Sequence, residues 1–406
     1  MRSHTLTTMI LIALSYPIQA LAVDSSDLAQ VTAKLESGDE IVRIVCFGDS
    51  VTGVYYHTGG RRAWPDMLGI ALKKQYPKAK IEMFNAGMSG NTTGAGLERI
   101  DRDVIARKPH LVAVMFGLND MVSGNRQAYR DNLKAIIRRC RESGAAVVLC
   151  TLNSVYPNQP RPMPVVAEFS QIVRDVAQEN SVPVADCFRA YEAVRSKNVT
   201  EWMLMMSEDI HPCMEGHKLY AETVAKAISG KPVSLADVSP PADTLQFTLA
   251  RLKAGQPVHV IAMPPYDQIL RDVLLKLFPK AEVNVTTWPV DGQSLAAMVK
   301  WSEGIRGQKP NLVVPAVPAN VKTKNEESFI RDYHWIVSWS AAYECAQWDM
   351  LPILPSVTGP VAPSTLHRTE LARRIIGGSD VEYVDRKSGD VRPARQILLE
   401  AVRKLR

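Results

Sequence analysis

One short segment, Gly48-Asp49-Ser50, could supply a nucleophilic hydroxyl group. An apolar run over residues 41–47 ends abruptly at this segment, as a buried strand does when it stops and presents a polar side chain. Ligands of open α/β sheets bind beyond the carboxyl ends of the strands, so Ser50 is a candidate nucleophile. Gly, Asp and Ser are also ordinary turn residues, and the assignment therefore depends on other polar segments.

Three further polar segments lie near the predicted ends of other strands. They are residues 85–92, 117–120 and 207–212. If the sheet is doubly wound, all four segments converge on one rim. Together they offer a hydroxyl, an imidazole, an acid, a backbone amide and a side-chain amide, which are the parts of an acyl-transfer site.

In order and spacing, the four segments resemble the blocks of the GDSL/SGNH hydrolase superfamily over about residues 41–230. The resemblance implies a lipase/acylhydrolase-like enzyme with Ser50 as nucleophile and His211 as general base. It also implies an oxyanion hole formed by the amides of Ser50 and Gly90 and the side chain of Asn119. These roles fit the chemistry, because a serine needs a base to remove its proton and an oxyanion needs donors placed in advance.

The acid that orients His211 is open at this point. The family places it three residues before the histidine, usually as Asp, but that position here is Glu208, and Asp209 is only two residues away. The register favours Glu208, since Glu can replace Asp in such triads. Asp209 would take the role if the turn shifts, and a Ser-His pair with loose acid support is a third alternative.

Several other polar residues near these segments have weaker claims to a role. His57, Arg61 and Arg62 follow the nucleophile in a long loop, and they either reach the substrate or belong to a solvated loop. Asp49 is expected to make structural hydrogen bonds at the strand end. His217 is interpreted as a helix residue.

Alternating apolar and amphipathic runs predict the elements that position the site. Strands are expected at 41–47, 80–85, 111–116, 145–152 and 182–187, and helices at 64–75, 94–105, 126–142 and 165–179, with a last helix after Met214. Continuously apolar strands alternating with helices indicate a parallel sheet covered on both faces. We therefore predict a three-layer α/β/α, flavodoxin-like fold.

The second half of the chain resembles a degenerate copy of the first. Residues 76–81 are echoed by 278–283, and 108–112 by 309–313, at offsets that differ by one residue. We expect a catalytic domain at 23–232, a linker at 233–247 and an inactive SGNH-like domain at 248–406. Pro264 and Pro265 stand where a serine would be needed, although Gly292 and Asn320 align with Gly90 and Asn119. This half would bind glycan, shape the first domain's pocket or only stabilise the chain.

Composition and the first residues predict the compartment. Residues 1–22 have a charged start, a short apolar run and a small-residue cleavage site near Ala22, which is typical of a signal peptide. We therefore expect a secreted or periplasmic protein with no stable membrane span.

The net charge of +6 is mild, without a dense basic block, and does not favour nucleic-acid binding. Of six cysteines, Cys187 and Cys213 are the only pair worth testing for a disulfide; no segment has metal-ligand spacing, and no cofactor is expected.

These observations favour an exported ester hydrolase that forms an acyl-enzyme on Ser50. The resemblance allows short-chain acyl esters, lipid esters and thioesters. A small acyl group, for example the O-acetyl group of a carbohydrate ester, is the first choice. The alternative is a non-catalytic glycan-binding or scaffold protein.

Overall fold

Five parallel strands form the first sheet of the computed structural model, which describes residues 26–242, 244–359 and 361–404. In chain order the strands are β1 (Ile41–Gly48), β2 (Lys80–Gly87), β3 (Leu111–Met115), β4 (Ala146–Cys150) and β5 (Val184–Ala185). They lie in the order β2-β1-β3-β4-β5, with every pairing parallel. This is the flavodoxin-like, doubly wound order, and it confirms the predicted fold class.

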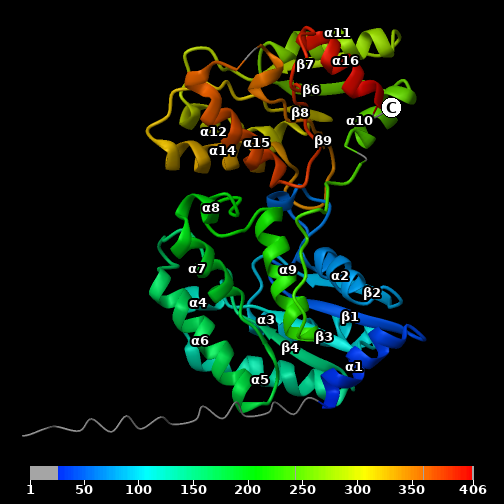
Figure 1. Cartoon of the computed structure of the whole chain (residues 1–406), viewed down its shortest axis with the longest axis vertical. Coiled ribbons are helices and arrows are strands. Elements are labelled where there is room, and N and C mark those ends of the chain that lie inside the picture. The colour runs from blue at the N-terminus through cyan, green and yellow to red at the C-terminus, as the bar shows by residue number, and fades with distance from the viewer. Residues whose placement is uncertain (1–25, 243, 360, 405–406) are drawn as a thin grey trace, which may run out of the picture.

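Helices cover both faces of this sheet (Figure 1). On one face α2 (Trp64–Gln75) and α1 (Ser26–Ser37) pack against α9 (Met214–Ser229). On the other face three helices pack in series: α3 (Thr93–Asp103), α5 (Arg126–Glu142) and α6 (Met163–Glu179). The bounds of α2 and α5 are those predicted from the sequence, because their apolar residues recur at the helical period. Strands β4 and β5 are shorter than predicted.

Short helices fill the connections around this framework. They are η1 (Tyr56–Thr58), η2 (Ile105–Arg107), α4 (Asp120–Ser123), α7 (Cys187–Lys197) and α8 (Val199–Met203). The loop that follows β1 and the loop between α8 and α9 both lie beyond the carboxyl ends of the strands. They deliver the residues of the candidate site.

A second parallel sheet follows, with the order β7-β6-β8-β9. Its strands are β6 (Val258–Ala262), β7 (Val283–Thr287), β8 (Leu312–Val314) and β9 (Asp349–Met350). Its helices are α10 (Gln246–Lys253), α11 (Tyr266–Leu277), α12 (Leu295–Ser302), α13 (Ile305–Gln308), α14 (Glu326–Ser340), α15 (Leu366–Gly377) and α16 (Ala394–Lys404), with η3 (Pro355–Val357) and η4 (Pro363–Thr365) between them. This order repeats that of the first four strands of the first sheet.

Backbone details at the echoed segments also repeat. Lys108 and Lys309 both adopt the left-handed conformation, with φ of 50° and 46°, and Gly90 and Gly292 both have φ of 74°. The backbone amide that follows each lysine-proline pair makes an equivalent hydrogen bond. His110 N donates to the Arg43 carbonyl of β1, and Asn311 N donates to the His259 carbonyl of β6, each at 2.8 Å. These repeats are consistent with the proposed duplication.

The two domains stack along the long axis of the molecule (Figure 1) and share a polar interface. Arg62 of the first domain forms an ion pair with Asp380 at 2.5 Å, and Glu201 forms one with Arg374, also at 2.5 Å. The segment between α9 and α10 does not hang free. Leu235 is fully buried and its amide donates to Glu222 on α9, so this segment packs along the first domain.

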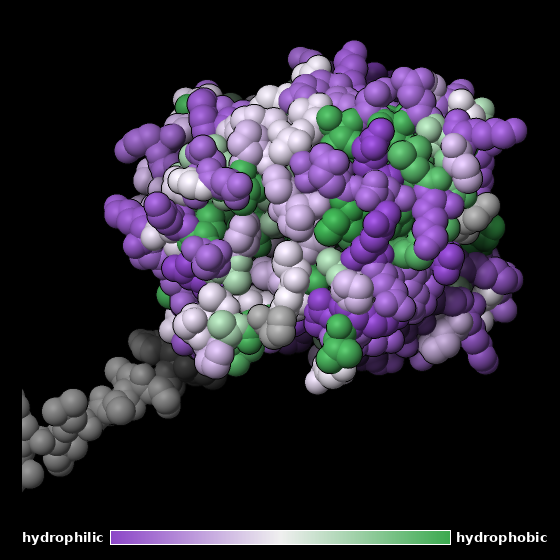
Figure 2. Space-filling view, turned by 90° about the horizontal axis from the view of Figure 1, so that it is seen from above, coloured by the Kyte–Doolittle hydropathy of each residue, from purple (hydrophilic) through white to green (hydrophobic). Residues whose placement is uncertain are grey.

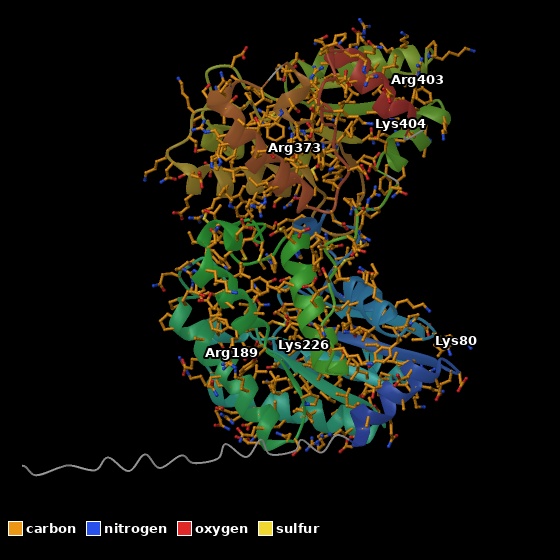
Figure 3. The ribbon with its side chains drawn as sticks, viewed as in Figure 1. Lys80, Arg189, Lys226, Arg373, Arg403 and Lys404 are labelled. Atoms are coloured by element: carbon orange, nitrogen blue, oxygen red, sulfur yellow. The ribbon has the colours of Figure 1, made fainter. Side chains whose placement is uncertain are left out.

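The end of the second domain farthest from the first is mostly hydrophilic, with scattered hydrophobic patches (Figure 2). Basic side chains such as Lys80, Arg189, Lys226 and Arg373 are dispersed over both domains (Figure 3). In the described ranges no helix is long and apolar enough to span a membrane.

Three further predictions concern the cysteines, metal ligands and the first residues of the chain. All six cysteines lie within the described residues and are free, so Cys187 and Cys213 do not form the disulfide that we considered, although both are buried. Among the residues that the structure describes, no group of three or more His, Cys, Asp or Glu side chains could hold a metal ion. The predicted signal peptide, residues 1–22, lies outside the described residues.

Candidate active site

Ser50 stands in a tight turn directly after β1. The Asp49 carbonyl accepts hydrogen bonds from the amides of Thr52 and Gly53 at 3.1 Å, and the Asp49 carboxylate accepts one from Val51 at 2.9 Å. A side chain at Gly48 would collide with the Met115 carbonyl on β3, because an added Cβ would lie only 2.4 Å from that oxygen. The local backbone therefore requires glycine and presents the partly exposed Ser50 beyond the sheet.

A hydrogen-bonded chain joins Ser50 to an acid. Ser50 Oγ lies 2.8 Å from His211 Nε2, and His211 Nδ1 faces Glu208 Oε1 in a short hydrogen bond. The Glu208 carboxylate also accepts from the backbone amides of His211 at 2.8 Å and Ile210 at 3.1 Å. Burial alone would raise the pKa of Glu208, but the facing His211 and these hydrogen bonds hold that pKa below its ordinary value. Glu208 therefore favours its carboxylate form and is placed to orient His211.

The loop that carries this pair is closed by backbone contacts. Met206 and Pro212 form an antiparallel bridge, and Ser207 N donates to the His211 carbonyl at 2.9 Å. Asn153 holds the same loop from the end of β4, through a 2.9 Å bond from Nδ2 to the Ile210 carbonyl. Because hydrogen bonds hold the loop at both ends, the positions of Glu208 and Asp209 relative to His211 are fixed.

Asp209 points away from the histidine. Its carboxylate forms an ion pair with Arg331 of α14 in the second domain, with Oδ1 and Nη2 separated by 2.6 Å. Of the alternatives left open by the sequence, the structure places Glu208, three residues before His211, in contact with the imidazole.

Two of the candidate oxyanion donors lie on neighbouring loops. Gly90 is exposed, with φ of 74° and no atom within 4 Å of an added Cβ, so the position favours glycine for its backbone conformation. Asn119 donates from Nδ2 to the Asn91 carbonyl at 3.0 Å. Its Oδ1 faces Arg161 Nη2 at 3.4 Å. Both ends of the Asn119 amide are thus oriented, and one Nδ2 hydrogen remains for another acceptor.

His57 is neither a substrate contact nor part of a solvated loop. It is buried, with 2% exposure, and its ring stacks on His211 with a centroid separation of 4.6 Å and an interplanar angle of 2°. Its Nε2 lies 3.1 Å from the Ser50 carbonyl. Burial and the neighbouring histidines lower the pKa of His57 well below its ordinary value. A neutral ring therefore supports the inner side of His211, which is a role that the sequence pattern did not indicate.

Arg61 and Arg62 also differ from expectation. Arg62 donates to both carboxylate oxygens of Asp380, at 2.9 and 2.5 Å, and Arg61 lies 3.8 Å from Asp349. Both arginines therefore engage the second domain. Asp380 and Asp349 lie more than 280 positions away in sequence, so no local signal could reveal these contacts.

Asp49 is fully buried, and one of its carboxylate oxygens has no hydrogen-bond partner among the described residues. Burial raises the pKa of Asp49 to about 7, although the bond from the Val51 amide opposes the shift. Between its ordinary pKa of 3.8 and about 7 the folded chain holds a proton that the unfolded chain has released. The stability contribution of this group therefore falls as pH rises through that window.

The Asp49→Asn variant should remove this pH dependence, because asparagine resembles the protonated acid and still accepts from Val51. We expect the variant to gain roughly 2–4 kcal/mol of unfolding free energy over the wild type at pH 8, and little at pH 4. Urea unfolding at several pH values measures this difference. The exposed Asp131→Asn variant is the control, and a gain that is equal at all pH values would contradict the assignment.

Comparison with known proteins identifies the first domain. Residues 46–219 match the model of the GDSL-like Lipase/Acylhydrolase family. The match spans most of the first domain, which is therefore GDSL-like. The chain is 26% identical over 170 residues to an acetylxylan esterase of Geobacillus stearothermophilus, covering 39% of this chain and 76% of the relative. It is 28% identical over 187 residues to an arylesterase of Vibrio mimicus, and this match covers 46% of this chain and 88% of the relative.

The crystal structure of the acetylxylan esterase Axe2 from Geobacillus stearothermophilus is also similar. It has a TM-score of 0.41 and 22% identity, and the match covers 48% of this chain and 97% of that one. The GDSL-like domain is an ester-bond hydrolase, as its family and its sequence relatives indicate.

The family match ends before the second sheet. Strand β6 is followed by Met263, Pro264 and Pro265, so no serine occupies the place that corresponds to Ser50. Gly292 and Asn320 are both exposed on this domain. The loop after α14 nevertheless reaches the first domain, where the Tyr343 carbonyl accepts from the amide of Tyr56, a neighbour of His211.

Proposed function

We propose that the GDSL-like domain is an exported serine esterase that removes short acyl groups, such as acetyl, from carbohydrate esters. The observation that carries the mechanism is the hydrogen-bonded chain from Ser50 through His211 to Glu208. The names of the sequence relatives, an acetylxylan esterase and an arylesterase, support the choice of ester. The signal-like first residues support export.

The proposed reaction proceeds in two acyl-transfer steps. His211 Nε2 accepts the Ser50 proton while Oγ forms a bond to the acyl carbon, and the carbonyl electron pair moves onto its oxygen. As this intermediate collapses, the bond to the alcohol oxygen breaks and His211 gives its proton to that oxygen. Water then attacks the acyl-enzyme in the same way and releases the carboxylic acid.

The oxyanion is assigned to the backbone amides of Ser50 and Gly90 and to the remaining Nδ2 hydrogen of Asn119. Within the described ranges, the hydrogen bonds leave the backbone amides of Ser50 and Gly90 free, and Asn119 is held in place by Asn91 and Arg161. Donors that are oriented before the reaction stabilise the developing charge without reorganising, and each is worth roughly 3 kcal/mol.

A panel of p-nitrophenyl esters of increasing acyl length tests the acyl preference. We expect kcat/KM to be highest for acetate and to fall about tenfold or more by octanoate, because a longer chain would desolvate Asn91, Asn119 and Arg161. A preference for octanoate would contradict the short-acyl assignment.

Labelling with a fluorophosphonate separates this proposal from a non-catalytic glycan-binding role. The expected result is one adduct per folded chain, at Ser50. Folded protein that takes no adduct and hydrolyses no ester would favour the binding role.

A further inference from the structure

We propose that the second domain completes the active site, with Tyr343 forming a subsite for the sugar ring of the leaving alcohol. This inference rests on the proposed esterase function and specifies which part of the substrate the second domain recognises. Tyr343 lies on the loop after α14 and is 48% exposed.

Tyr343 forms hydrogen bonds with two loops of the first domain that lie next to Ser50. Its carbonyl accepts from Tyr56 N at 3.1 Å, and its hydroxyl lies 3.1 Å from Ser89 Oγ. Ser89 directly precedes Gly90, one of the proposed oxyanion donors. Tyr343 of the second domain therefore contacts the loop after β1 through its backbone and the oxyanion loop through its side chain.

Three tyrosine rings form a continuous aromatic wall that ends at the general base. Tyr343 packs against Tyr55 and Tyr56, each with a centroid separation of 5.8 Å. Tyr56 in turn meets the His211 ring edge to face, at 6.0 Å. The Tyr55 hydroxyl accepts from Ser89 N at 2.8 Å, which fixes the other end of the wall.

Arg306 of the second domain holds this wall rigid. Its guanidinium lies 4.6 Å from the Tyr56 ring centroid, 4.4 Å from that of Trp339 and 5.6 Å from that of Tyr343. It also donates to the carbonyls of Ser338 at 2.8 Å and Ala341 at 3.1 Å. The guanidinium is thus held by backbone carbonyls and aromatic faces. Arg306 therefore fixes the wall in place, and Tyr343 supplies its exposed surface.

The chemistry of the reaction places the leaving alcohol beside this wall. His211 must return its proton to the alcohol oxygen, so that oxygen lies near Nε2, while the oxyanion faces Gly90 and Asn119. Tyr56 contacts the His211 ring, and its backbone amide donates to the Tyr343 carbonyl of the second domain. The alcohol therefore leaves the acyl carbon along Tyr56 toward Tyr343.

The chemical character of the wall fits a sugar ring. A pyranose has an apolar C–H face that packs on an aromatic ring and hydroxyl groups at its rim. The exposed Tyr343 ring can pack against the C–H face. The hydroxyl groups of Tyr343 and Ser89 can form hydrogen bonds with the hydroxyl groups at the rim. A small aliphatic alcohol would gain little from either contact.

The test compares two acetate esters whose leaving groups differ. We expect Tyr343→Ala to lower kcat/KM about tenfold for a monoacetylated methyl xyloside, mainly through KM, and to change kcat/KM for ethyl acetate less than twofold. Tyr343→Phe keeps the ring and should retain most of the sugar-ester activity. Arg374→Ala breaks an interdomain ion pair that involves none of the wall residues and should leave the ratio of the two substrates unchanged.

The outcomes separate this inference from the proposed function. Suppose that the wild type hydrolyses ethyl acetate, but that Tyr343→Ala lowers kcat/KM by the same factor for both esters or leaves kcat/KM for the xyloside unchanged. The proposed subsite is then wrong, and the proposed esterase function is still supported. If the wild type hydrolyses neither ester and takes no fluorophosphonate, the proposed function fails and the subsite fails with it. Thermal unfolding of each variant establishes that folded protein is compared.

Discussion

Ser50→Ala is expected to reduce kcat/KM for p-nitrophenyl acetate by about 10⁴-fold or more while the chain stays folded. The variant removes the hydroxyl oxygen that would form the acyl bond and that lies 2.8 Å from His211 Nε2. Ser50 is partly exposed, so the loss of its hydroxyl group should cost little stability. The remaining catalysis would come from the oxyanion donors and from substrate binding.

A matched control separates the loss of the nucleophile from a general effect of removing a serine. Ser196 is exposed on α7, and its hydroxyl donates only to the Ala193 carbonyl. Ser196→Ala should keep wild-type kcat/KM and wild-type fluorophosphonate labelling. Full esterase activity in Ser50→Ala, together with an adduct on another serine, would contradict the assignment.

The second large effect is expected from Glu208→Gln, which should lower kcat about 10³-fold with a small change in KM. The reason is the orientation of His211. A glutamine amide can present an N–H group to Nδ1 and favour the tautomer whose Nε2 carries a proton, so that Nε2 can no longer accept the Ser50 proton. Glutamine also cannot stabilise the imidazolium that forms during the reaction.

Asp209→Asn is the matched control, because it changes the neighbouring carboxylate in the same way. Asp209 pairs with Arg331 across the domain interface and makes no contact with the imidazole. We expect kcat within about twofold of the wild type and at most about 1 kcal/mol of lost stability, since both partners are partly exposed. A large loss in Asp209→Asn with an active Glu208→Gln would reverse the assignment of the acid.

The lowered pKa of Glu208 gives the same pair of variants a pH signature. The folded pKa lies below the ordinary value of 4.5. The stability that Glu208 contributes is therefore present above that value and is lost as pH falls through the folded pKa. Urea unfolding between pH 3 and pH 7 should show this dependence in the wild type and in Asp209→Asn, and should not show it in Glu208→Gln.

Much of the first domain could be predicted because its determinants are local. The run at 41–47 followed by Gly48-Asp49-Ser50 indicates a buried strand that ends in a turn, and the structure contains β1 and that turn. Helices α2 and α5 have the predicted bounds, since their apolar period is regular. The shorter β4 and β5 show the limit of this approach, because apolar residues continue past the last paired residue of a strand.

The sequence by itself determined the doubly wound order, the four segments that meet at one rim and the register that favours Glu208. The fold class and the convergence of the segments follow from hydrophobic periodicity and turn residues, whereas the register follows from the resemblance to the GDSL/SGNH superfamily. Only the tertiary structure decided that Asp209 faces Arg331, that His57 is buried against His211 and that Tyr343 reaches Ser89. Each of these depends on surfaces brought together from distant parts of the chain, and a side chain's role there is set by which partner folding places within a few ångströms of it.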